Sequence, residues 1–178
     1  MHNRILKIAS NDQLTGLANR RLFEERLAQA IAKCRRYGGS FALVCIDLDG
    51  FKPINDTYGH QSGDLVLKAV SERLLASVRA VDTVARLGGD EFILILDPAP
   101  NDLDDLKAIC SRTLENIEKP IALEQVECSV SCSLGVAIFQ KDGADADELF
   151  KSADQAMYLA KDEGKATFRF ADSSFSES

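Results

Sequence analysis

Apolar and polar residues alternate along the chain in two rhythms, one helical and one strand-like. Apolar residues spaced three and four apart predict helices over residues 20–37, 62–79, 102–118 and 146–161, with a shorter turn of helix over 52–58. Continuous or alternating apolar runs predict strands over residues 41–47, 83–86, 91–96, 128–139 and 167–170. The predicted order is therefore helix, strand, two helices, two strands, helix, strand, helix and strand.

Local signals indicate where these elements begin and turn. Residues that can cap helices precede three of them, at Asn19, Asn101 and the pair Asp145 and Glu148. Gly88 and Gly89 separate two strands, which is a strong hairpin signal, and residues 121–139 suggest a second hairpin. Because hairpins pair strands antiparallel, we expect an α/β protein of the α+β type, with a mixed sheet flanked by helices.

The length of 178 residues is that of one domain. Residues 1–10 have the pattern of the end of a helix that begins upstream, and residues 173–178 that of a frayed tail. We therefore expect a single domain over residues 11–172, without an internal repeat.

Composition narrows the class of protein. The 28 acidic residues exceed the 21 basic ones, which argues against a protein that binds nucleic acid by neutralising phosphates. The longest apolar run, residues 41–46, is too short to span a bilayer, and the first residues lack the apolar stretch of a secretory signal. Five cysteines without a zinc spacing indicate reduced thiols, so we expect a cytoplasmic domain even if the parent protein is anchored in a membrane.

Carboxylates stand at two places that can meet at one edge of the sheet. Asp47 and Asp49 come where the buried strand ends, and Asp90 and Glu91 occupy the hairpin tip. Converging carboxylates repel one another unless a cation joins them, and hard oxygen ligands select ions such as Mg²⁺ or Mn²⁺. The alternative is that the two aspartates form turn hydrogen bonds and that the hairpin tip is simply solvated.

Residues 51–64 are dense in polar groups. Asn55 and Asp64 together offer the donors and acceptors that suit the edge of guanine, which presents a carbonyl flanked by N–H groups. Ordinary turn and capping chemistry also explains Asn55, and a lone His60 is more often a structural hydrogen-bonding residue than a catalyst. The spacing leaves both interpretations open.

Six sequence motifs that follow one another along the chain favour the functional interpretation of these residues. They lie at residues 12–20 (DQLTGLANR), 46–52 (IDLDGFK), 55–60 (NDTYGH), 86–92 (RLGGDEF), 133–137 (SLGVA) and 153–158 (ADQAMY), the last followed by Ala160 and Lys161. Together they closely resemble the GGDEF family of diguanylate cyclases, over about residues 10–170. The resemblance implies a five-stranded sheet like that of nucleotide cyclases and polymerase palms. It also implies condensation of two GTP molecules into cyclic di-GMP, with release of two pyrophosphates.

The resemblance also implies roles for individual residues. Metal ligands for Mg²⁺ or Mn²⁺ would be Asp47, the Leu48 carbonyl, Asp90 and Glu91. Catalytic residues would be Asp90, Glu91 and Lys52, with Asp90 favoured as the base and Lys52 steadying the phosphates. Substrate would contact Phe51, Asn55, His60, Asp64, Gly88, Gly89, Lys161 and Lys165. The family usually has arginine where this chain has Lys165, which keeps the charge but loses the two-pronged fork.

The resemblance implies regulation as well as catalysis. Arg79 and Asp82 match the family's inhibitory Arg-x-x-Asp motif, with Arg112 as a further candidate, so we expect product inhibition by cyclic di-GMP. A homodimer bringing together one GTP per subunit is expected, with a sensor domain upstream. Two alternatives remain, a catalytically silent domain that binds GTP or cyclic di-GMP, and the regulatory half of a cyclic di-GMP phosphodiesterase.

Overall fold

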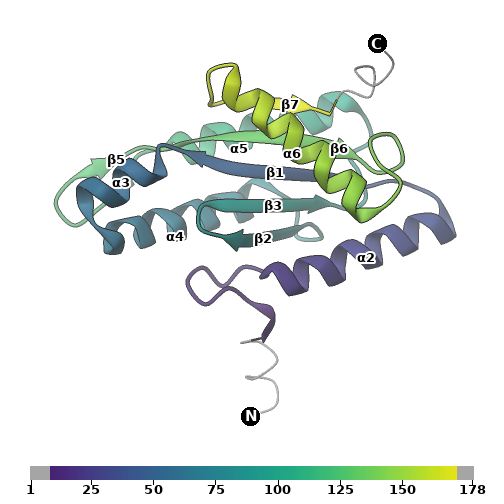
Figure 1. The fold of residues 1–178 in the computed structure, drawn as a ribbon, viewed down its shortest axis with the longest axis horizontal. Coiled ribbons are helices and arrows are strands. Elements are labelled where there is room, and N and C mark those ends of the chain that lie inside the picture. The colour runs from purple at the N-terminus through teal and green to yellow at the C-terminus, as the bar shows by residue number, and fades with distance from the viewer. Residues whose placement is uncertain (1–8, 172–178) are drawn as a thin grey trace.

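The computed structural model of this chain describes residues 9–171. Five named helices run through this part: α2 (Arg20–Tyr37), α3 (Phe51–Tyr58), α4 (His60–Ser77), α5 (Leu103–Glu118) and α6 (Ala146–Asp162). The strands are β1 (Ala42–Asp49), β2 (Thr83–Gly88), β3 (Glu91–Leu96), β4 (Ile121–Ala122), β5 (Glu127–Cys128), β6 (Ser131–Ile138) and β7 (Phe168–Phe170). Five of the strands form the main sheet, β4 and β5 form a separate two-stranded sheet, and Figure 1 shows helices packed against the main sheet.

The predicted mixed sheet is confirmed. Its five strands have the order β2-β3-β1-β6-β7. The pairs β2–β3, β3–β1 and β1–β6 are antiparallel, and β6–β7 is parallel. The strand β1 is therefore central, with a neighbour on each side, as its nearly continuous apolar sequence predicted.

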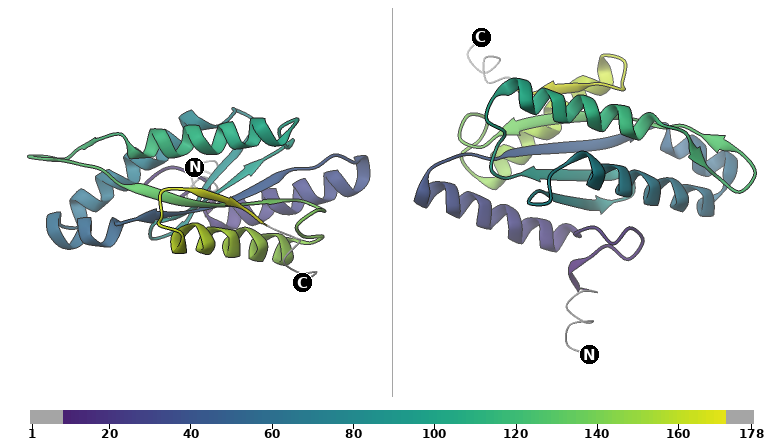
Figure 2. Two further views of the ribbon diagram at one scale, coloured as in Figure 1. Left: turned by 90° about the horizontal axis from the view of Figure 1, so that it is seen from above. Right: turned by 180° about the vertical axis from the view of Figure 1, so that it is seen from behind.

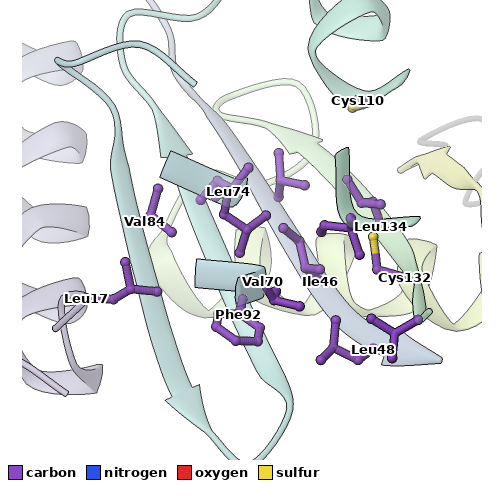
Figure 3. Packing of buried hydrophobic residues seen from close by; sticks show 14 of the residues in the cluster. Leu17, Ile46, Leu48, Val70, Leu74, Val84, Phe92, Cys110, Cys132 and Leu134 are labelled. Atoms are coloured by element: carbon purple, nitrogen blue, oxygen red, sulfur yellow. The ribbon is translucent and has the colours of Figure 1, made fainter. Parts of the chain in front are cut away.

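Helices cover both faces of this sheet (Figure 2). Val44, Ile46 and Leu48 of β1 face a core cluster shared with α4 and α5, part of which is drawn in Figure 3. Leu43 and Cys45 face the opposite cluster, shared with α2 and α6. Successive side chains of a strand point to opposite faces, so the polar residues that end β1 at positions 47 and 49 belong to the α6 side.

A glycine brings α6 unusually close to the sheet. A Cβ on Gly135 of β6 would lie 2.0 Å from the carbonyl oxygen of Ala153 and 2.3 Å from the amide nitrogen of Met157. The buried face of α6 is largely alanine, including Ala156 and Ala160. Small residues on both β6 and α6 therefore set the distance between the helix and the sheet. This distance also fixes where the C-terminal end of α6 lies relative to the sheet.

Two predicted helix starts were wrong. Asp102, rather than Asn101, caps α5, because its side chain accepts from the Asp105 amide. The helix expected over residues 62–79 is His60–Ser77, since Gly59 at φ +91° both ends α3 and begins α4. Asn19 and Asp145 cap α2 and α6 as predicted.

The hairpin predicted at Gly88 and Gly89 is confirmed with its turn shifted by one residue, whereas the second predicted hairpin is wrong. The register shifts between Arg86 and Gly88, so Gly88 pairs with Glu91, and Gly89 and Asp90 form the turn. Residues 121–139 do not form one hairpin, because β4 pairs with the short β5 while β6 joins the main sheet. The expectation for residues 1–10 falls mostly, and that for 173–178 wholly, outside the described residues. No helix within residues 9–171 is long and apolar enough to cross a membrane.

The five cysteines are free thiols, as predicted, and we expect most of them to be inert in the folded protein. Burial raises the pKa of Cys110 to about 12 and raises the pKa of Cys132 further, so little reactive thiolate is present at neutral pH. Cys128 is only half-buried. Iodoacetamide labelling followed by mass spectrometry should therefore modify Cys128 first and the others only after unfolding. Rapid native labelling of Cys110 would contradict the packing of this core.

Candidate functional site

Strand β1 ends beside the turn between β2 and β3 (Figure 1), and the predicted metal-binding residues lie on these two segments. Asp47 lies directly opposite Glu91 in the register of β1 with β3. The Leu48 amide donates to the Asp90 carbonyl at 3.3 Å, which ties the strand end to the turn. Three of the four expected carboxylates therefore belong to one edge of the sheet.

The negative charge of Asp47 is only partly neutralised by the described residues, which leaves room for a further cation. Its Oδ1 atom is buried and has no hydrogen-bond partner within residues 9–171. Its Oδ2 atom lies 3.3 Å from the Lys161 ammonium nitrogen. Burial and then the nearby Asp90 carboxylate raise the pKa of Asp47, against the opposing effect of Lys161. The charged form of Asp47 is thus under-compensated.

Asp49 has a different environment from the other carboxylates. It is buried, and it accepts hydrogen bonds from the hydroxyls of Ser131 and Ser133, the Lys161 ammonium and the Ala166 amide. Burial by itself would raise the pKa of Asp49, but these bonds together lower it. The hydrogen-bonding capacity of Asp49 is therefore used within the protein. This favours the alternative that Asp49 forms structural hydrogen bonds over a role in binding a metal ion.

The remaining residues fit a divalent ion that is held mainly by its substrate. Within residues 9–171, no three side chains of His, Cys, Asp or Glu gather closely enough to hold an ion by themselves. Mg²⁺ usually takes only one or two carboxylates from a protein and completes its shell with water and phosphate oxygens. The orphaned Oδ1 of Asp47 and the neighbouring Asp90 suit that kind of site. The full predicted ligand set, with Leu48 and Glu91, stays a prediction.

The residues predicted to bind guanine lie on α3 and α4. Phe51 and Ile54 bury the inner side of α3, which leaves Asn55 half-buried over the start of α4. A Cβ on Gly63 would lie 1.7 Å from the side-chain oxygen of Asn55, so the carboxamide rests directly over that glycine. Asp64 is the next residue of α4 and is exposed. Asn55 and Asp64 thus belong to one pair of packed helices, as guanine recognition would require.

We expect Gly63→Ala to disturb this pair more than it disturbs the fold. The added methyl group would displace the Asn55 carboxamide, which is the flexible end of a side chain and can move away. The affinity for a non-hydrolysable GTP analogue should fall about tenfold, as expected for one lost polar contact, while the thermal midpoint changes little. An unchanged affinity, measured by calorimetry, would mean that Asn55 does not touch the nucleotide.

The other predicted substrate residues border the same edge. Lys52, His60 and Lys165 are exposed. Gly88 and Gly89 have φ values of +146° and +50°, conformations that glycine adopts far more readily than other residues. None of these positions is contradicted, and their contacts with substrate stay predictions.

Arg86 connects the N-terminal turn to the hairpin, which the sequence interpretation missed. Its Nη1 lies 3.1 Å and 3.2 Å from the two carboxylate oxygens of Asp12, and its Nε donates to the Gly89 carbonyl at 2.9 Å. Asp12 also accepts from the amide and hydroxyl of Thr15. Both residues lie in motifs quoted above, but a separation of 74 residues gave no signal that they would meet.

The predicted inhibitory residues are bonded to one another and to nearby backbone. The Arg79 guanidinium grips Asp82 through Nε at 3.0 Å and Nη2 at 2.8 Å, and the side chain of Asp82 is fully buried. Arg112 of α5 donates twice to the Ser77 carbonyl at the end of α4. Both arginines therefore stand near the end of α4, and their binding of product stays a prediction.

Comparison with known proteins decides the family. The sequence profile described as "Diguanylate cyclase, GGDEF domain" matches residues 9–167. The chain belongs to the GGDEF domain family. The chain is 43% identical to the bifunctional diguanylate cyclase/cyclic di-GMP phosphodiesterase MucR of Pseudomonas aeruginosa, over 96% of this chain and 24% of MucR. It is 35% identical to the diguanylate cyclase DgcS of Shewanella oneidensis, over 90% of this chain and 52% of DgcS.

Solved structures agree with this assignment. The GGDEF domain of TpbB from Pseudomonas aeruginosa aligns with a TM-score of 0.87 at 36% identity, covering 91% of this chain and 94% of that one. The coiled coil and GGDEF domain of DgcB from Caulobacter crescentus, in complex with c-di-GMP, aligns with a TM-score of 0.88 at 26% identity, covering 96% and 90%. The chain spans a quarter to a half of the two relatives named above, which are longer proteins.

Proposed function

We propose that this GGDEF domain is a diguanylate cyclase that condenses two GTP molecules into cyclic di-GMP. The observation that carries the proposal is the buried Oδ1 of Asp47, which has no partner among residues 9–171 and lies beside the carboxylates of the signature turn and the Lys161 ammonium. A cluster of carboxylates that lacks full charge compensation, beside a lysine, suits a metal–triphosphate substrate. Relatives named as diguanylate cyclases, DgcS and TpbB, support the same activity.

In the proposed reaction the 3′-hydroxyl oxygen of one GTP attacks the α-phosphorus of the other. An oxygen–phosphorus bond forms, the bond from that phosphorus to the pyrophosphate oxygen breaks, and the hydroxyl proton passes to Asp90 or Glu91. A second such step closes the ring, so two pyrophosphates leave. Asp47, Asp90, Glu91 and the Leu48 carbonyl would hold a divalent ion, which would supply charge neutralisation for the phosphates and lower the pKa of the attacking hydroxyl.

The protein's own residues bind and orient the two nucleotides. Asn55 and Asp64 bind guanine, and Phe51 and His60 line the substrate site. The ammonium groups of Lys52, Lys161 and Lys165 hold the phosphates. The product is two-fold symmetric, so the simplest assembly is a homodimer with one GTP per subunit and an upstream sensor domain controlling the pairing. A GTP-consuming domain of this kind belongs on the cytoplasmic side.

The test is incubation of the purified protein with GTP and Mg²⁺, with products separated by chromatography and identified by mass. We expect cyclic di-GMP and two equivalents of pyrophosphate, no product in EDTA, and higher specific activity after fusion of a dimeric coiled coil ahead of Met1. GTP binding without product, even in the fused dimer, would reject catalysis and favour the silent binding domain.

We expect Arg79→Ala to weaken binding of cyclic di-GMP while GTP turnover continues. Arg79 is partly exposed, and although its Nε and Nη2 atoms are bonded to Asp82 and the Pro98 carbonyl, the other edge of its guanidinium can meet a guanine edge or a phosphate. Calorimetric titration should show a loss of affinity of at least tenfold, equivalent to one charge-assisted pair. The matched control is Arg21→Ala, an exposed arginine on α2. Equal affinity of wild type and Arg79→Ala for cyclic di-GMP would exclude this inhibitory site. The thermal midpoint of the variant is measured as well, because the substitution removes the partner of the buried Asp82 and can lower stability.

A further inference from the structure

The Asp49 carboxylate joins two parts of the protein that lie far apart in sequence. Its Oδ1 accepts from the Ser133 hydroxyl at 2.9 Å and from the Lys161 ammonium at 3.2 Å. Its Oδ2 accepts from the Ser131 hydroxyl at 2.8 Å and from the Ala166 amide at 3.1 Å. Only 5% of this side chain is exposed, so all four bonds form in a largely water-free setting.

The sheet fixes one half of this arrangement. Asp49 lies opposite Ser131 in the register of β1 with β6, and the two-residue period places Ser133 on the same face. The two serines therefore anchor the carboxylate within the sheet. The other two donors, Lys161 and Ala166, come from 112 and 117 residues further along the chain.

The segment that follows α6 needs such an anchor. Gly164, Lys165 and Ala166 have φ values of +122°, +67° and +53°. Two adjacent residues with side chains in the left-handed region persist only where their surroundings hold them. The Lys165 amide donates to the Ala160 carbonyl at 3.1 Å, and the Ala166 amide donates to Asp49. Asp49 thus links the turn itself to the sheet, and directly after the turn the Thr167 carbonyl accepts from the Leu134 amide of β6 at 3.0 Å.

Lys161 lies between two carboxylates that are not equivalent. It is 3.3 Å from Asp47 Oδ2 and 3.2 Å from Asp49 Oδ1. Asp49 has three further donors, whereas Asp47 has a buried oxygen with no partner in the part of the chain that the structure describes. If another cation neutralises Asp47, Lys161 can turn away from it and remain tethered to Asp49. The ammonium then stays at the site instead of swinging into solvent.

We propose that Asp49 is a positioning residue that holds Lys161 and the 164–166 turn in place, so that the ammonium groups of Lys161 and Lys165 converge on the nucleotide phosphates. Asp49 touches neither substrate nor metal in this arrangement and acts only through the lysines. The part that concerns phosphates rests on the proposed function. The part that concerns the turn does not.

The first test is amide hydrogen exchange on the nucleotide-free protein, which is independent of catalysis. Asp49→Asn keeps the shape of the side chain but places a donor, or an uncharged acceptor, where a carboxylate oxygen met the Ala166 amide. We expect exchange in residues 163–167 to accelerate at least tenfold, as when a protecting hydrogen bond opens freely. The control is Asp162→Asn, which removes an exposed charge next to Lys161 and should leave exchange unchanged.

The second test is a double-mutant cycle on the affinity for a non-hydrolysable GTP analogue with Mg²⁺. Asp49→Asn should weaken binding about tenfold, whereas Asp162→Asn should not. In a Lys161→Met, Lys165→Met background, Asp49→Asn should have almost no further effect, because a residue that acts through the lysines loses its route. If Asp49→Asn does not fold, Ser131→Ala retains the carboxylate, removes one anchor and should give a smaller change in both measurements.

The outcomes separate the two proposals. Failure of wild type to bind the GTP analogue would reject the proposed function, while the exchange measurement would still decide whether Asp49 holds the turn. Unchanged exchange in both Asp49→Asn and Ser131→Ala would overturn the positioning role. Equal weakening by Asp49→Asn with and without the two lysines would also overturn it, because the effect would then not pass through them.

Discussion

Replacing Asp47 with asparagine should reduce cyclic di-GMP synthesis by at least about 100-fold, equivalent to the several kcal/mol that a bound metal ion contributes to phosphoryl transfer. Asparagine has nearly the same shape but carries no charge for a divalent ion. The buried Oδ1 of Asp47 has no partner among the described residues, so only Oδ2, which lies 3.3 Å from the Lys161 ammonium, contributes to the folded structure. The assay is product formation at saturating GTP and Mg²⁺.

The stability of the Asp47→Asn protein should rise slightly or stay unchanged, although its activity falls. Burial and Asp90 raise the pKa of Asp47, which means that folding disfavours its ionised form. A carboxyl group whose folded pKa is raised lowers stability at a pH above both of its pKa values, so at neutral pH the neutral asparagine removes that cost. Loss of the contact with Lys161 offsets part of the gain. The thermal midpoint without metal should therefore not fall.

The control for Asp47→Asn is again Asp162→Asn, the same substitution at an exposed position near Lys161. Its turnover should stay close to wild type. Near-normal turnover by a folded Asp47→Asn protein would reject Asp47 as a metal ligand. A large loss of stability would instead show that the carboxylate has a structural role that its contacts do not reveal.

The largest effect on stability is expected from Gly135→Ala. The new methyl group would lie 2.0 Å from the Ala153 carbonyl oxygen and 2.3 Å from the Met157 amide nitrogen, well inside contact distance. These are backbone atoms of α6, which cannot rotate away as a side chain can. We expect a loss of about 3 kcal/mol in the free energy of unfolding, at the upper end for an overpacked core. For a domain of this size that is a fall of roughly 6–12 °C in the thermal midpoint.

The same substitution should also weaken nucleotide binding, because lifting α6 moves Lys161 away from Asp47 and Asp49. Gly39→Ala is a useful comparison. Gly39 has φ +86°, but a Cβ there would meet nothing within 4 Å, so only backbone strain of about 1 kcal/mol is expected. If the two alanine variants were equally stable, close packing of α6 on β6 would not be what positions the helix.

Much of this fold could be predicted because local physics and tertiary packing agree. The run that forms β1 is apolar on both faces, which only a central strand between two layers of helices requires. The predicted limits of α2 are the observed ones, because Asn19 caps one end and Gly38 ends the other. Capping at α5 was misplaced by one residue, since Asn101 and Asp102 are both suitable caps and only the turn geometry selects between them.

The candidate residues could be predicted, but their differing environments could not. Asp47 and Asp49 are two residues apart on one face of one strand, and their sequence context gives no reason to separate them. The structure leaves Asp47 under-compensated and surrounds Asp49 with four donors. The donors come from β6 and from the end of α6, so their arrival depends on strand order and on the height of a helix.

The sequence by itself determined the element order, the mixed sheet, the family and the set of polar residues at one sheet edge. These properties follow from periodicity, turn chemistry and motifs, which are local in the chain. Tertiary structure decided which carboxylate stays available, that Arg86 joins Asp12 to the signature turn, and that Gly63 and Gly135 admit close neighbours. These properties depend on contacts between segments that are distant in sequence. Such contacts produce no local pattern, so they cannot be recognised in a single sequence.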